Sequence, residues 1–258
     1  LTGTGYTFNN TTTATVSAIL AGSVNLTQAG SGNTTLSGAN TYTGTTTVSG
    51  GTLTLGNSNV LADTSALTVS GGTFAMGANS DTVAAVTLSA GSITGAGGTL
   101  TGSSYSVTNS SGTTSISAIL GGTSIALTKT GDGTLTLSGI NTYTGSTTIS
   151  AGTLALSTAG AIANSSGVAN SGTFDISATT SGASIITLSG AGGVNIAGKT
   201  LTITNGSTTY SGVMSGASGN LTISGGTQVL SGANTYTGTT TVSGGTLTLG
   251  NSNVLADT

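Results

Sequence analysis

The stretch that decides the fold is SGANTYTGTTTVSGGTLTLGNSNVLADT, which occupies residues 37–64 and returns without a single change as residues 231–258. A looser copy, SGINTYTGSTTISAGTLALSTAGAIA, occupies residues 138–163 between them. Self-similarity at a long period, with short strand-like units inside it, is typical of a solenoid whose units bury their apolar faces against their neighbours. Repetition therefore predicts the fold more strongly than any single motif.

The repeats divide the chain into modules of about a hundred residues. The signature Asn-Thr-Tyr-Thr-Gly begins at Asn40, Asn141 and Asn234, so successive copies are 101 and 93 residues apart. No change of composition or linker separates the modules. We therefore expect residues 1–258 to form one continuous β-solenoid segment, an excerpt of a longer repeat array.

Alternating side chains predict short strands inside each copy. Residues 45–56 read TTTVSGGTLTLG, in which threonines alternate with aliphatic residues and Ser49-Gly50-Gly51 interrupts the alternation. A period of two indicates two short strands, and glycine fits the tight corner between them. The residues expected to face the core are Val48, Leu53, Leu55, Ile149, Leu154, Leu156, Val242, Leu247 and Leu249.

The turns favour a parallel solenoid over an antiparallel sandwich or barrel. Hairpin signals are scarce, with only Asn205-Gly206 and Asp132-Gly133 in the chain. Stacking of similar strands on the next coil explains why similar residues return on one face. We expect an all-β parallel β-helix of about a dozen coils and about 60 Å, at roughly 20 residues per coil.

Each signature also carries an asparagine and a tyrosine at a turn. A tyrosine there could be a binding platform, but its fixed place beside the Asn-Thr corner favours a packing role. Asparagine tolerates the left-handed backbone of turns and bonds to neighbouring backbone. The expected turn residues are Asn40, Tyr42, Asn141, Tyr143, Asn234 and Tyr236.

Composition excludes several classes of function. Only 3% of the residues are charged, and Lys129 and Lys199 are the only basic ones. Binding to nucleic acid by neutralising phosphates is therefore excluded. The chain has no cysteine or histidine, and we find no apolar run of the ~20 residues that a membrane-spanning helix needs. No membrane span is expected in this segment.

Carboxylates are the only candidate catalytic groups. General acid–base chemistry needs paired carboxylates, yet Asp63 and Asp257 are the same repeat position in distant copies. The calcium-binding repeat Gly-Gly-x-Gly-x-Asp is not fulfilled, and Thr130-Gly131-Asp132-Gly133 is its nearest approach. We predict no enzyme activity, no cofactor, and no catalytic, cofactor-binding or metal-binding residue.

Residues 127–156, LTKTGDGTLTLSGINTYTGSTTISAGTLAL, resemble the autotransporter-associated β-strand repeat of bacterial type V secreted passenger proteins. The first copy departs from it with LTQAG at residues 26–30, and the third with LTISG at residues 221–225. The resemblance implies a right-handed parallel β-helix stalk, exported to the bacterial surface or beyond, commonly in adhesin-like proteins, without catalytic residues.

The expected function is therefore a structural repeat of a secreted or cell-surface bacterial fibre or adhesin stalk, a filament or spacer for adhesion or matrix. The expected partners are further copies, by end-to-end coil stacking or lateral bundling, and surface glycans or host or neighbouring cell surfaces. The alternative is a threonine-rich face that binds ice or carbohydrate. Residues 45–47 and 239–241 suggest such a face, but the threonine pairs drift in position along the sequence.

Overall fold

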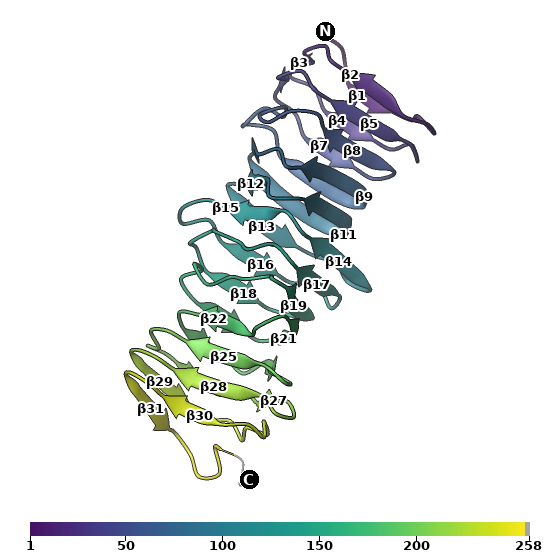
Figure 1. The fold of residues 1–258 in the computed structure, drawn as a ribbon. Coiled ribbons are helices and arrows are strands. Elements are labelled where there is room, and N and C mark those ends of the chain that lie inside the picture. The colour runs from purple at the N-terminus through teal and green to yellow at the C-terminus, as the bar shows by residue number, and fades with distance from the viewer. Residues whose placement is uncertain (256–258) are drawn as a thin grey trace.

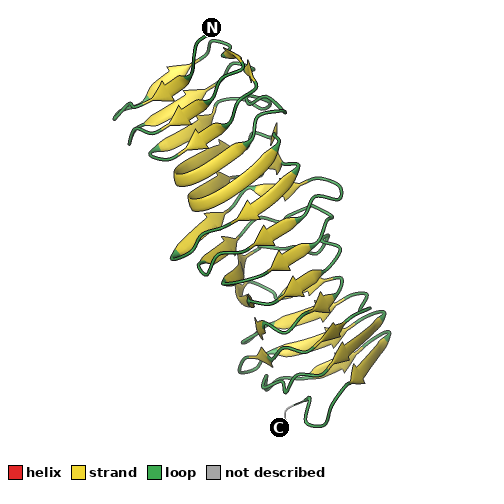
Figure 2. Cartoon of the chain, turned by 180° about the vertical axis from the view of Figure 1, so that it is seen from behind, coloured by secondary structure: helices red, strands yellow, loops and turns green. Residues whose placement is uncertain are grey.

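The computed structural model describes residues 1–255, which form an elongated stack of β-strands without a helix. The strands follow one another along the rod from the N-terminal to the C-terminal end (Figure 1). Seen from behind, the same stack consists of strands and connecting loops alone (Figure 2). All strand pairings among the described residues are parallel, from Tyr6↔Leu26 at one end to Leu230↔Leu249 at the other. The predicted all-β parallel solenoid of about a dozen coils is confirmed.

Three faces alternate along each coil in the first two thirds of the rod. The first face contains β1 (Tyr6–Phe8), β4 (Leu26–Gln28), β7 (Thr46–Val48), β13 (Ser104–Val107), β16 (Leu127–Lys129), β18 (Thr147–Ile149), β20 (Val168–Asn170) and β23 (Leu188–Ser189). The second contains β2 (Ala14–Val16), β5 (Asn33–Leu36), β8 (Thr52–Leu55), β14 (Thr113–Ile116), β17 (Thr134–Leu137), β19 (Thr153–Thr158), β21 (Thr173–Thr179), β24 (Gly193–Asn195) and β27 (Met214–Ser215). The third contains β3 (Ala21–Gly22), β6 (Thr41–Tyr42), β10 (Asp81–Thr82), β12 (Thr99–Thr101) and β15 (Ile119–Gly121).

Two long strands join the first face to the second. They are β9 (Leu67–Gly77) and β11 (Ala85–Gly95), and they pair with each other through several register shifts. Toward the C-terminal end two separate sheets continue the rod. They contain β22 (Ala183–Ile185), β25 (Thr200–Ile203), β28 (Asn220–Ile223) and β30 (Thr240–Val242), and β26 (Thr209–Tyr210), β29 (Thr227–Leu230) and β31 (Thr246–Leu249).

The interior is a set of apolar columns, because alternate residues of each strand point inward. Of the residues expected to face the core, those of the first two copies are buried: Val48, Leu53, Leu55, Ile149, Leu154 and Leu156. In the third copy the expectation fails for Val242 and Leu249, which are each 49% exposed, while Leu247 is partly buried. The reason is that no described strand of a following coil pairs with β30 or β31.

The expected glycine corner is present between β7 and β8. Gly51 has a φ of 51°, in the left-handed region that favours glycine. A Cβ atom at Gly51 would collide with the carbonyl oxygens of Gly30 and Gly32 in the preceding coil. Glycine is therefore required at this corner for two reasons, the left-handed backbone conformation and the close contact with the preceding coil.

The first two signature copies lie in phase on the rod. One inward column of the first face runs from Gln28 to Lys129, which are equivalent residues of the two copies. Its members are Gln28, Val48, Val69, Leu88, Val107 and Lys129. A spacing of 101 residues thus returns the chain to the same column after five coils.

The third copy is turned by one face around the rod. Leu230, the equivalent of Leu137 on the second face, pairs with Tyr210, and Tyr210 bridges to Gly190 directly after β23 of the first face. The second face in turn continues through β24 into Met214, the sequence counterpart of Leu20 near the third face. The spacing of 93 residues is shorter than 101 by eight, the separation between Lys129 and Leu137. The chain has therefore lost the length of one face.

Candidate interaction site at the signature corner

The signature asparagine bridges the coils on either side of it. Asn40 Nδ2 donates to the carbonyl of Val60 in the next coil at 2.9 Å, and Asn40 Oδ1 accepts from the amide of Leu20 in the preceding coil at 2.8 Å. Asn141 and Asn234 make the equivalent bridges and are also buried. Each side chain therefore holds three coils together.

The expected left-handed backbone is not found at these asparagines. Non-glycine residues with positive φ among residues 1–255 are Asn59, Ser124, Thr158, Ser218 and Asn253. The signature asparagine serves through its amide side chain, which needs both a donor and an acceptor to join two neighbours.

The signature tyrosine packs inside the rod and ends in a chain of hydroxyl groups. Tyr42 Oη lies 2.5 Å from Thr46 Oγ1, which lies 3.1 Å from Ser65 Oγ of the next coil. Ser65 donates to the carbonyl of Gly44 at 2.6 Å. Burial raises the pKa of Tyr42 to about 12, against the lowering effect of the bonds to Thr46 and Ser65. A buried phenol of this kind offers no platform to a ligand.

The second copy repeats this chain of hydroxyls. Tyr143 Oη lies 2.7 Å from Thr147 Oγ1, and Thr147 Oγ1 lies 2.9 Å from Ser165 Oγ. These serines were not among the residues predicted from the sequence. Only their positions could have indicated this role. Ser65 follows the first signature copy at the start of the next coil, and Ser165 lies at the corresponding place after the second copy.

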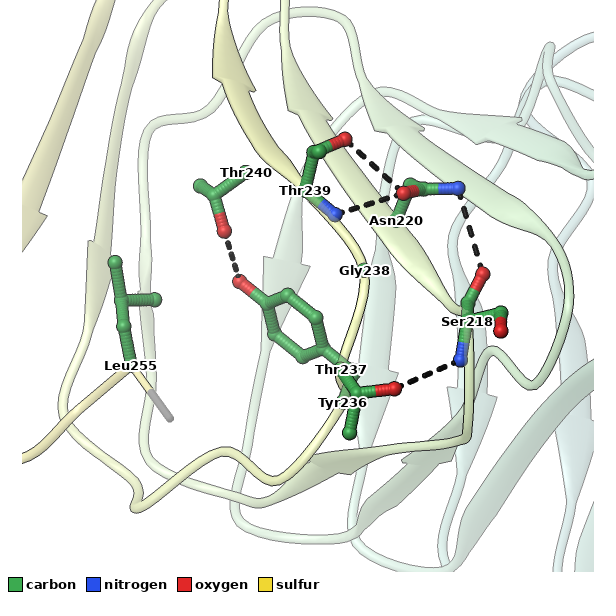
Figure 3. A pocket seen from close by; sticks show the side chains of 8 residues that line it. All are labelled: Ser218, Asn220, Tyr236, Thr237, Gly238, Thr239, Thr240 and Leu255. Carbon is green, nitrogen blue, oxygen red and sulfur yellow. Dashed lines mark hydrogen bonds between the residues drawn. The ribbon is translucent and has the colours of Figure 1, made fainter. Parts of the chain in front are cut away.

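In the third copy the hydroxyl chain stops at its second member, beside a hollow. Tyr236 Oη lies 2.5 Å from Thr240 Oγ1, and no serine of a following coil adjoins them among the described residues (Figure 3). The hollow has a volume of about 580 Å³ and is lined by Ser218, Asn220, Tyr236, Thr237, Gly238, Thr239, Thr240 and Leu255. It lies where Ser65 and the following coil sit in the first copy. None of the described residues that line the hollow carries a charge.

The rim of the hollow is fixed by hydrogen bonds between coils. Asn220 Oδ1 accepts from the amide of Thr239 at 2.8 Å and from its hydroxyl at 3.0 Å (Figure 3). The amide of Ser218 donates to Thr237 Oγ1 at 2.9 Å. These contacts use the polar groups of the rim for coil stacking.

The described carboxylates are scattered along the rod. Asp63 and Asp132 are exposed, Asp175 is half-buried and Asp81 is buried, whereas Asp257 lies outside the described residues. Residues 1–255 contain no group of three or more histidine, cysteine, aspartate or glutamate residues that could hold a metal ion. Of the described carboxylates, Asp63 lies near enough to the buried Asp81 for its negative charge to contribute to raising the pKa of Asp81.

A lysine in the core is the residue that sequence reasoning overlooked. Lys129 is fully buried at the position that Gln28 occupies in the first copy, and Nζ donates to the carbonyl of Gly131. Burial lowers the pKa of Lys129, while the nearby Asp132 acts in the opposite direction. The alternating pattern indicated this burial, because Leu127 and Lys129 are two residues apart in one strand and so point to the same face of the sheet.

Threonines form one regular column on the outside of the first face. The paired residues of successive coils are Thr7, Thr27, Thr47, Thr68, Thr87, Ser106, Thr128 and Thr148. Ala169 ends the run. The threonine pairs shift in position along the sequence, but one column of hydroxyl residues stays in register from coil to coil.

Comparison with known proteins identifies the class of repeat that builds this rod. The architecture defines a parallel β-solenoid made of stacked repeats. A family model described as the passenger-associated transport repeat matches residues 26–55, 127–156 and 223–249. The chain thus carries three passenger-associated transport repeats, as its resemblance to the repeat of autotransporter passengers predicted.

A curated relative extends this comparison to nearly the whole chain. The chain is 36% identical over 266 residues to the adhesin BmaC autotransporter of Brucella suis biovar 1 (strain 1330). The match covers 92% of this chain and 7% of the relative, so the chain spans a small part of that protein's length. No solved structure matches the chain. None of the described residues forms a helix long and apolar enough to cross a membrane.

Proposed function

We propose that this chain is a stalk segment of an adhesin-like passenger protein, secreted or displayed on a bacterial surface. The observation that carries the proposal is the unbroken parallel stacking of coils from β1 to β31, in a chain with three passenger-associated transport repeats. Each coil bonds to two neighbours, so stability accumulates along the rod. The role is structural and not enzymatic: the segment supplies length and mechanical continuity.

Further coils of the same kind are the partners that this design favours. The described coils already stack on one another through parallel strand pairs from β1 to β31. An unpaired strand edge is a template for another strand. End-to-end stacking of coils, within one long chain or between copies, would build a filament or spacer for adhesion or matrix. The targets proposed for the whole protein are surface glycans or cell surfaces.

Deletion of one whole module tests the stalk proposal. Removal of residues 37–137 joins Leu36 to Ser138 and takes out five coils while keeping the signature in phase. We expect the purified rod to shorten by about 24 Å in small-angle scattering. Displayed beneath an adhesive tip, the shortened segment should keep tip binding but reach less far from the cell. Unchanged length, or loss of binding by the isolated tip, would refute a spacer role.

The threonine column supports a second candidate, a surface that binds ice or carbohydrate. The observation in its favour is eight successive hydroxyl residues from Thr7 to Thr148 in register. The replacements Thr47→Lys and Thr87→Lys interrupt the column on the outside of the rod. Thermal hysteresis or glycan-array binding by the parent chain that disappears in this variant would favour the candidate, and no binding by the parent would dismiss it.

A further inference from the structure

One buried carboxylate in the rod has no use in the stalk role. Asp81, the first residue of β10, is 2% exposed. Its Oδ2 atom accepts hydrogen bonds from the amides of Val60 at 2.9 Å and Leu61 at 3.1 Å, both in the preceding coil. Its Oδ1 atom is buried and has no hydrogen-bond partner among the described residues. Such a group needs an explanation, because a buried unpaired acceptor is costly.

The signature asparagines provide that explanation. Asn40 accepts from the preceding coil through Oδ1 and donates to the next coil through Nδ2. Asp81 makes the first of these two contacts and pairs with Leu100 of the next coil in the β10–β12 ladder. A carboxylate has acceptors alone, whereas a protonated carboxyl group gains a single O–H donor and so matches the amide. Asp81 can complete the bridge only in its protonated form.

We propose that Asp81 is a proton-binding site that controls how tightly the coil after the first signature copy is held. With a proton on Oδ1, the side chain donates to the backbone of the following coil at β12 and bridges three coils, as Asn40 does. Without that proton, the negative charge of Asp81 is buried and its side chain makes no hydrogen bond to the following coil. The rod then opens more readily at this coil than elsewhere.

The surroundings of Asp81 favour proton uptake. Burial raises the pKa of Asp81 to about 6, and the amides of Leu61, Val60 and Thr82 oppose this shift. Asp63, in the exposed loop before the next coil, raises the pKa further by its negative charge. Tyr42 on β6 is the other titratable neighbour and stays neutral in this range, since its own pKa is about 12. No cation balances the buried charge in this set.

The direction of the pH effect follows from the raised pKa. Between the ordinary value of 3.8 and about 6, the folded coil binds more protons than the opened coil. Stability at this coil is therefore highest below the ordinary value, falls as the pH rises through this window, and is constant above it. A shift of about two units corresponds to a roughly hundredfold change in the opening equilibrium.

Hydrogen exchange at the amides of Val60 and Leu61 tests the proposal in the full chain. After correction for the intrinsic pH dependence of exchange, we expect protection of these amides to fall by up to about a hundredfold from pH 4 to pH 7. Asp81→Asn restores a permanent donor, so it should abolish this pH dependence and keep the protection of the acidic form. Asp63→Asn is the matched control, which should retain the pH dependence with a lower midpoint.

A second measurement applies even if Asp81→Asn disturbs folding. The carboxyl carbon of Asp81, followed by NMR in the parent chain, should titrate with a midpoint clearly above the ordinary value of 3.8. A midpoint at or below 4 would overturn the proposal. So would equal pH dependence in the parent and in a folded Asp81→Asn variant.

Discussion

Residues 37–64 and 231–258 have one sequence and two environments. Val48 is fully buried while its duplicate Val242 is 49% exposed, and Leu55 and Leu249 differ in the same way. The cause is β9, which lies on the first copy through pairs such as Leu53↔Phe74. No described strand lies on the third copy. Burial in this rod is therefore supplied by the next coil and is not a property of the repeat alone.

Contacts to the preceding coil are the same in both copies. Asn40 and Asn234 each accept from an amide of the coil before them, and Tyr236 remains as little as 4% exposed. Contacts to the following coil agree only in part. Asn234 donates to the carbonyl of Val254 as Asn40 donates to that of Val60, but the hydrogen bond from the amide of Thr46 to the carbonyl of Ala66 has no counterpart at Thr240 among the described residues. The third copy thus keeps its contacts to the preceding coil and lacks the strand pairing to a following coil that the first copy has.

The largest expected difference comes from a charge in the apolar column. Leu53→Asp places a carboxylate between coils and should cost about 3 kcal/mol or more, because it is buried without a partner. Leu247→Asp should cost far less, since water reaches the uncovered side of its coil. Limited proteolysis checks this, and parent-like resistance of Leu53→Asp would contradict the inward placement of Leu53.

Cavity formation should distinguish the copies by a smaller amount. Leu55→Ala removes buried methyl groups and should destabilise its coil by about 2–5 kcal/mol. Leu249→Ala, at a half-exposed site, should cost below about 1 kcal/mol by the same reasoning. Opening free energies from site-resolved hydrogen exchange measure both. Equal costs would mean that the third copy is covered in solution.

Glycine replacement should act alike in the two copies. Gly51 and Gly245 both have positive φ, and a Cβ at either would collide with carbonyls of the preceding coil. Gly51→Ala and Gly245→Ala should each lower the free energy of unfolding by more than about 1–2 kcal/mol, which is the cost of placing alanine in the left-handed conformation alone. Gly77→Ala is the control, with a φ of 58° and open space around the new Cβ. A milder Gly51→Ala than Gly77→Ala, judged by thermal unfolding, would refute the crowding at this corner.

The smallest effect is expected at the signature tyrosine. Tyr42→Phe removes a phenol hydroxyl from a closed chain of hydroxyls and should cost about 1 kcal/mol. Tyr236→Phe should cost less, because water in the adjoining hollow can replace the lost partner of Thr240. Local exchange rates compare the two variants. A larger loss in Tyr236→Phe would oppose the role given to Ser65.

Local alternation was enough to predict most of the fold. Leu53, Leu55 and their counterparts in the second copy could be placed inward because a strand has a period of two. The exposure of Val242 could not be predicted, since it depends on a neighbour and not on its own sequence. The turn of the third copy by one face was also missed. The spacings of 101 and 93 residues were visible, but the number of residues per face was not.

The polar interior was the least predictable part of the candidate site. Lys129 lies two residues after Leu127 in the same strand, so the alternating pattern places it inside. Its burial was not predicted, because a lysine is rarely buried. Asn40 was expected to tolerate a left-handed backbone and to bond to neighbouring backbone; only its amide bonds to the backbone of the adjacent coils are found. Asp81 stands in no motif, and its role depends on the Val60 and Leu61 amides that the coil brings to it.

Hydrogen exchange of a peptide common to both copies tests the central claim most directly. Residues 46–55 and 240–249 yield one identical peptide mass, so a single spectrum reports both environments. If strand pairing to the next coil stabilises each coil, this peptide should split into two isotope envelopes of equal area, one protected and one exchanging rapidly. A single protected envelope would contradict the account, because it would mean that identical sequences are equally stable with and without a covering coil.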